Sequence, residues 1–68
     1  MKLVFRNSRG KEIEIANIDN EGQAHEEIYK FCAERNFIIH NIRTFQIEEC
    51  IQYDVGSWSE LFLLYINE

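Results

Sequence analysis

The chain opens with two short apolar stretches that predict a β-hairpin. Residues 3–5 (Leu-Val-Phe) are apolar, and in residues 11–15 glutamate alternates with isoleucine, the period of a strand with one buried face. Between them, Asn-Ser-Arg-Gly at residues 7–10 suits a tight turn that ends with glycine in the left-handed region of backbone space. We therefore expect a hairpin at the start of the chain.

A helix is predicted over residues 21–35, where apolar residues recur at helical spacing. Asn20 is a suitable cap, and Gln23, three residues on, can reach back to the backbone at the helix start. Asn36 favours a left-handed stop, after which Phe37 can fold back on the last turn. The apolar stripe consists of Ala24, Ile28, Phe31 and Cys32.

Further strands are predicted after the helix. Residues 37–39 lead into a strand over residues 43–47, and residues 51–55 alternate in the same way. The glutamate pair at residues 48–49 is either the tip of a hairpin or a bend in one long strand; we favour the hairpin because strands rarely exceed five or six residues. The odd-numbered apolar residues are expected to share the core side of the sheet, namely Phe37, Phe45, Ile47, Ile51, Tyr53 and Val55.

Residues 61–66 are apolar without alternation, which is typical of a strand covered on both faces. The order is then β-β-α-β-β-β with no parallel βαβ repeat. This order predicts a single α+β domain over residues 1–68, with one helix packed on a mostly antiparallel sheet. One helix covers one face of such a sheet. We therefore expect a second subunit to cover the other face, in a homodimer.

Composition indicates a folded protein that is small for a domain. The 68 residues are 46% hydrophobic and 13% aromatic, which is enough to build a core. The two cysteines, Cys32 and Cys50, lack the spacing of a zinc or redox motif, and Cys32 fits a small core residue. Residues 1–10 become charged after three apolar residues, unlike a signal peptide, and the longest apolar run is too short to span a bilayer. We expect a cytoplasmic protein with free thiols and no membrane contact.

Charge is unevenly placed along the chain. The net charge is −5, although residues 1–11 carry four basic groups and no acid, so the rest holds three basic against twelve acidic groups. This balance disfavours nucleic acid as a partner, because phosphates attract a basic face. The acidic body is either ordinary solubilising charge or a means of approaching a basic protein.

Catalytic chemistry finds little support in the sequence. His25 at the helix start fits a solvated surface residue, and His40 has no partner pattern for nucleophilic catalysis. Glu48 and Glu49 are adjacent, so on a strand they would point to opposite faces and could not share a proton. No His, Cys, Asp or Glu spacing indicates a metal site. We predict a protein that is not an enzyme, without catalytic residues, metal or cofactor.

Recognition is the remaining class of function, and the C-terminal third carries the candidates. Aromatic residues crowd there, and tryptophan and tyrosine are typical of binding hot spots. Trp58 is either a plug at the end of the core or an exposed anchor, and both interpretations stay open. With Trp58 as an anchor, further contacts would come from Asp54, Ser57 and Glu60. The alternative is a pocket that sequesters a small signalling molecule, in a dimer cleft lined by Arg43, Tyr53 and Trp58.

The stretch Asp-Val-Gly-Ser-Trp-Ser-Glu-Leu-Phe at residues 54–62 resembles a known signature. It is similar to the C-terminal Asp-x-Gly-Ser-[aromatic or His]-Ser-x-x-Phe pattern of very small proteins encoded by phages and prophages of Gram-positive bacteria. Those proteins also open with a hairpin, continue through one helix, and have a strand similar to Arg-Thr-Phe at residues 43–45. Leu61 departs from the aromatic pair expected before the end of the signature. The resemblance implies an accessory protein that binds and blocks a bacterial host or defence-system protein.

Overall fold

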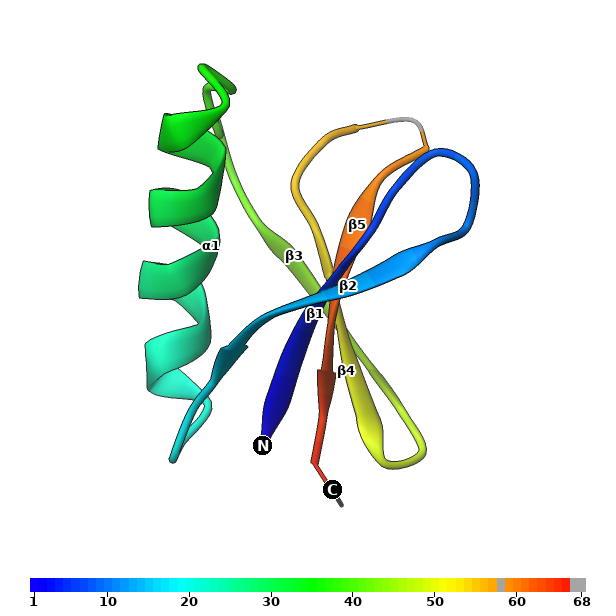
Figure 1. Ribbon diagram of the computed structural model, residues 1–68. Coiled ribbons are helices and arrows are strands. Elements are labelled where there is room, and N and C mark those ends of the chain that lie inside the picture. The colour runs from blue at the N-terminus through cyan, green and yellow to red at the C-terminus, as the bar shows by residue number, and fades with distance from the viewer. Residues whose placement is uncertain (58, 67–68) are drawn as a thin grey trace.

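The computed structural model describes residues 1–57 and 59–66. Its helix packs along one face of a five-stranded antiparallel sheet (Figure 1), which confirms the predicted α+β class and element order. The elements are β1 (Lys2–Arg6), β2 (Glu12–Asn17), α1 (Gly22–Glu34), β3 (Arg43–Ile47), β4 (Cys50–Asp54) and β5 (Leu61–Tyr65).

The sheet has the strand order β2-β1-β5-β4-β3, so the last strand in sequence is the central one. It joins the β1–β2 hairpin to the β3–β4 hairpin, antiparallel to both neighbours. Phe62 and Leu64 are buried under α1, and Leu63 on the other face is only 4% exposed. Coverage of both faces explains why β5 is apolar without alternation.

The first hairpin closes as the sequence predicts. Gly10 has a φ of +82°, a conformation that costs glycine no Cβ penalty. Its N–H donates to the carbonyl of Asn7 at 2.9 Å, and the Asn7 side-chain oxygen accepts from the N–H groups of Arg9 and Lys11. The turn thus fixes the pairing of β1 with β2.

The start of α1 is held by Asn20 and Gln23. The Asn20 side-chain oxygen accepts from the Gln23 N–H at 3.2 Å, and the Gln23 side chain accepts from the N–H of Asp19 at 2.8 Å. The predicted bond from Gln23 to Asn20 is present, but the N-cap is Glu21 instead of Asn20, and the return bond goes to Asp19 instead of Asn20. The bond to Asn20 satisfies one of the backbone donors that a helix start leaves free.

The end of α1 follows the predicted left-handed stop. Asn36 has a φ of +58°, and its N–H donates to the carbonyl of Ala33 at 3.1 Å. The Phe37 N–H donates to the carbonyl of Cys32 at 2.8 Å. Together these are the two bonds of a Schellman motif, which turns the chain sharply away from the helix axis.

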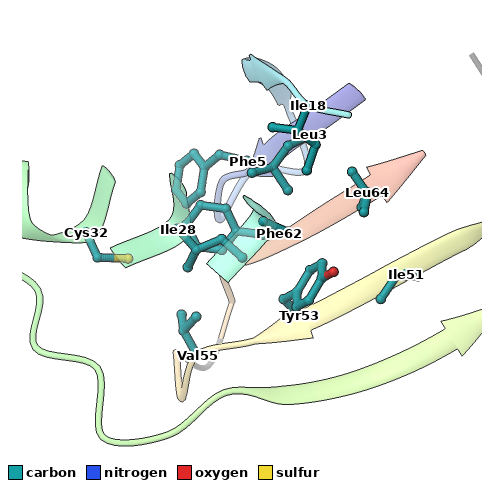
Figure 2. Close-up of a cluster of buried hydrophobic side chains, with 11 residues drawn as sticks. Leu3, Phe5, Ile18, Ile28, Cys32, Ile51, Tyr53, Val55, Phe62 and Leu64 are labelled. Carbon is teal, nitrogen blue, oxygen red and sulfur yellow. The ribbon is translucent and has the colours of Figure 1, made fainter. Parts of the chain in front are cut away.

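The core lies between α1 and the three strands β1, β5 and β4 (Figure 2). Ala24, Ile28 and Cys32 are the buried residues of the helix, which confirms most of the predicted stripe, while Phe31 is half-buried at its margin. No residue of β3 belongs to this cluster among the described residues. The strand members of the cluster are Leu3, Phe5, Ile51, Tyr53, Phe62 and Leu64.

The β3–β4 hairpin is present, but one prediction about its faces is wrong. The turn is Glu48-Glu49, with Ile47 opposite Cys50 and Phe45 opposite Gln52. A two-residue turn places odd-numbered residues of β3 opposite even-numbered residues of β4, and residues that are directly opposite share a face. The even-numbered residues of β4 face away from α1, so Phe45 and Ile47 also lie on that face. They are 46% and 51% exposed instead of buried with the core.

The connection from α1 to β3 also differs from expectation. Residues 37–42 form no strand, and pairing with β4 begins at Arg43. Phe37 is exposed rather than part of the core, and Ile38 is 77% exposed. The Schellman bonds explain the difference, because they direct the chain away from the helix end before it can join the sheet.

The face opposite α1 is covered within one chain at β1 and β5. The Tyr65 hydroxyl donates to the Glu12 carboxylate at 2.7 Å, and Arg6 donates to the same carboxylate at 2.7 Å. Tyr65 lies on β5 opposite Lys2, so its side chain must cross β1 to reach Glu12 on β2. Val4, which lies on the same face of β1 as Lys2 and Arg6, is only 3% exposed. The uncovered part of this face is therefore the β3 side.

Candidate functional site

The loop between β4 and β5 is shaped by its own polar side chains. The Gly56 N–H donates to the Asp54 carboxylate at 2.9 Å, and the Glu60 N–H donates to the Ser57 hydroxyl oxygen at 3.2 Å. Gly56 has a φ of +94°, which confirms the predicted glycine turn. Asp54 and Ser57 therefore stabilise the loop itself. Trp58, the predicted anchor or plug, lies outside the described residues.

The candidate residues around this loop do not all meet in one place. Arg43 lies opposite Asp54 in the β3–β4 ladder, and both line a hollow of about 590 Å³. Asn41, Gly56 and Ser57 complete its described wall.

Tyr53 lies on the other side of the sheet from Arg43. It is buried under α1, with its ring edge-on to His25 at 5.5 Å between centroids. Burial, assisted by the charge of Glu21, raises the pKa of the Tyr53 hydroxyl. Arg43 and Tyr53 therefore point to opposite faces, and one chain does not bring them together in a single cleft.

A separate cavity of about 80 Å³ lies between the end of α1 and the β4–β5 loop. The cavity wall is mostly apolar and includes four phenylalanine side chains. Sequence reasoning singled out Glu60 and Ser57 but not Arg35, whose guanidinium lies 3.6 Å from the Glu60 carboxylate. Since Arg35 and Glu60 meet only through tertiary packing, no local pattern in the sequence pairs them. The lining residues are Phe5, Phe31, Cys32, Arg35, Phe37, Val55, Ser57, Glu60 and Phe62.

The most exposed apolar surface follows β3 and the segment before it. We call it the β3 surface and define it by Phe45 and Ile47 together with the outer edge of β3. All five residues of β3 are exposed, and within residues 1–57 and 59–66 no strand pairs with that outer edge. An exposed apolar strand at a sheet edge can pair with another polypeptide. Sequence reasoning missed this surface because it placed Phe45 and Ile47 in the core.

The histidines and cysteines are the other described side chains with potential for reactive chemistry. His25 and His40 are exposed on different elements, α1 and the connection to β3. Burial raises the pKa of the Cys32 and Cys50 thiols, which makes both poorer nucleophiles at neutral pH. Across the part of the chain that the structure describes, no three His, Cys, Asp or Glu residues gather as metal ligands.

Comparison of the chain with models of known protein families, with curated proteins and with solved structures finds no match. In the described part of the chain, the helix is neither long nor apolar enough to cross a membrane.

Proposed function

We propose that this chain is a non-enzymatic binding module that recognises another protein through the β3 surface. The observation that carries the proposal is the exposure of Phe45 and Ile47 on a strand whose outer edge has no partner among the described residues. Main-chain groups at such an edge provide affinity for an extended segment, and alternate side chains provide specificity. The partner would add a sixth strand beside β3 and cover these two side chains.

The two edges of the sheet differ in a way that supports this assignment. The β2 edge carries Glu12 and Glu14, and its register shifts so that Ile15 is an extra, unpaired residue. Charge and bulges both protect an edge against pairing. By contrast β3, with the sequence Arg-Thr-Phe-Gln-Ile, has one charged residue and no shift in its register with β4. β3 is therefore the edge suited to a partner strand.

The resemblance of residues 54–62 to small phage and prophage proteins supports a class of partner but does not name one. We propose that the chain is such an accessory protein and that it blocks a bacterial host or defence-system protein in the host cytoplasm. The net charge of −5 supports a basic target, because opposite charge speeds encounter. A second copy of the chain could occupy the same edge, and light scattering at micromolar concentration would detect that homodimer.

A tagged pull-down from bacterial lysate tests the β3 surface. The informative variant is Phe45→Thr with Ile47→Thr, because threonine keeps strand propensity while removing the apolar contact. Ile13→Thr is the matched control: Ile13 is similarly exposed but lies on β2. Loss of the captured protein with the double variant alone, at unchanged melting temperature, supports the proposal. Equal capture by both variants would contradict it, and Trp58→Ala tests the predicted anchor in parallel.

One observation favours a second candidate function, the sequestering of a small signalling nucleotide. Arg43 borders the hollow of about 590 Å³, which is within the usual size range of ligand pockets, and guanidinium groups bind phosphate. Its described lining lacks an aromatic ring on which a base could stack. Thermal-shift measurements with nucleotides, using wild type and Arg43→Gln, separate the two candidates. A shift that depends on Arg43 would favour sequestration.

A further inference from the structure

The guanidinium of Arg35 rests on an aromatic cluster at the end of α1. Its Cζ atom lies 4.8 Å from the centroid of the Phe5 ring and 5.6 Å from that of Phe31. Both distances are within the range of about 6 Å in which a cation is attracted to the negative face of a ring. Arg35 thus occupies a site with the character of an aromatic cage.

The rings of this cage are held in place by one another. Phe5 and Phe31 are 4.9 Å apart between centroids, and Phe62 lies 5.3 Å from Phe5 and 5.6 Å from Phe31. Phe5 and Phe62 belong to the buried core (Figure 2). The cage is therefore built before any ligand arrives, which lowers the entropic cost of binding.

A carboxylate completes the site. Glu60 lies 3.6 Å from the Arg35 guanidinium, measured from Oε2 to Nη2. Aromatic faces beside a carboxylate favour a cation that is only weakly hydrated, and a guanidinium has this property.

Arg35 itself is held only loosely in the cage. Its side chain is 48% exposed, and the distance to Glu60 exceeds the usual hydrogen-bonding range. Exposed ion pairs of this kind contribute little to stability. The cavity of about 80 Å³ beside the guanidinium shows that the site has more room than Arg35 fills. A competing group could therefore enter.

We propose that Phe5, Phe31 and Glu60 form a binding site for a guanidinium group, and that Arg35 is an intramolecular occupant which the ligand displaces. The ligand is an arginine side chain of another polypeptide or a small guanidine compound. This inference goes beyond the binding function proposed for the β3 surface and does not depend on it, because the cage and that surface are formed by different residues.

NMR titration of the ¹⁵N-labelled protein tests the site. The probes are N-acetyl-arginine methylamide and its neutral isostere, N-acetyl-citrulline methylamide, with methylguanidinium as the small compound. We expect the arginine probe to shift the amides of Phe37, Ser57 and Glu60, and the citrulline probe to leave them unchanged. Tighter binding of capped arginine than of methylguanidinium would indicate a polypeptide source, and equal binding would indicate recognition of the guanidinium group alone.

Variants at the cage decide whether Arg35 is displaced. If Arg35 fills the cage about nine-tenths of the time, Arg35→Ala lowers the apparent Kd for the arginine probe about tenfold. Arg9→Ala is the matched control, since it removes the same charge from the exposed hairpin turn. Adding Glu60→Gln to Arg35→Ala should weaken binding of the arginine probe at least about threefold. If Arg35→Ala does not fold, Arg35→Gln replaces it in these measurements. Equal affinity of Arg35→Ala and Arg9→Ala, or equal binding of the two capped probes, would overturn the proposal.

Discussion

Phe45 and Gln52 face each other across the β3–β4 ladder, and this pairing places the Phe45 ring on the side of the sheet away from α1. Phe45 is half exposed there, whereas Phe62 in the central strand is fully buried. The two phenylalanines therefore have different roles, one at the surface and one in the core.

Alanine at these two positions should separate the roles. We expect Phe45→Ala to lower the free energy of unfolding by less than about 1 kcal/mol, as at other surface positions. Phe62→Ala should lower it by about 3–5 kcal/mol, because it removes a ring from the packed core of a small domain. Urea titration followed by circular dichroism measures both. A loss of several kcal/mol at Phe45 would place that ring in the core after all.

The turn of the same hairpin offers a stabilising change. Glu48 has a φ of +54°, which is unfavourable for a residue with a long side chain, while asparagine tolerates this region. We expect Glu48→Asn to raise the free energy of unfolding by about 0.5–1 kcal/mol. Glu49→Asn is the control, because it removes the same charge from the same turn. Equal gains from both variants would assign the effect to charge repulsion rather than to backbone conformation.

Acid should weaken the fold partly through Glu12. The hydrogen bond from Arg6, and then that from Tyr65, lowers the pKa of the Glu12 carboxyl below its ordinary value of 4.5. Because the pKa of Glu12 is lower in the folded than in the unfolded chain, ionised Glu12 stabilises the fold fully at pH values above its unfolded pKa. This stabilisation is lost as the pH falls through the folded pKa. We expect Glu12→Gln to be less stable than wild type at pH 7, and we expect the difference to be smaller at pH 3. Urea titrations at both values test this, and an unchanged difference at pH 3 would rule it out.

The two thiols should differ in reactivity. Cys32 is buried between α1, to which it belongs, and the sheet, whereas Cys50 is half-buried on the opposite face of the sheet. We expect a thiol reagent at pH 8 to modify Cys50 in the native protein and to reach Cys32 only on unfolding. Cys50→Ser identifies the faster site, and the same reaction in urea is the control. Equal rates of modification of Cys32 and Cys50 in the native protein would show that the helix end opens readily.

The sequence predicted the features that depend on local signals. Gly10 and Asn36 set the hairpin turn and the helix end through their own backbone preferences, and the helical stripe identified the buried face of α1. The side of the sheet on which Phe45 lies depends instead on the strand register that a two-residue turn sets. A shift of that register by one residue moves every side chain of the strand to the other face. The contact of Arg35 with Glu60 depends on how α1 lies over the β4–β5 loop, which no residue pattern encodes.

The central position of β5 has a consequence for how the protein is made. The ribosome releases β5 after the five other elements, and until then the β1–β2 and β3–β4 hairpins have no common partner. Two-stranded hairpins are marginally stable in water. Until synthesis passes residue 65, the edge of β1 that pairs with β5 has no partner and the helix face is not fully covered. The five-stranded sheet can be completed only once β5 has been made, because that strand joins both halves.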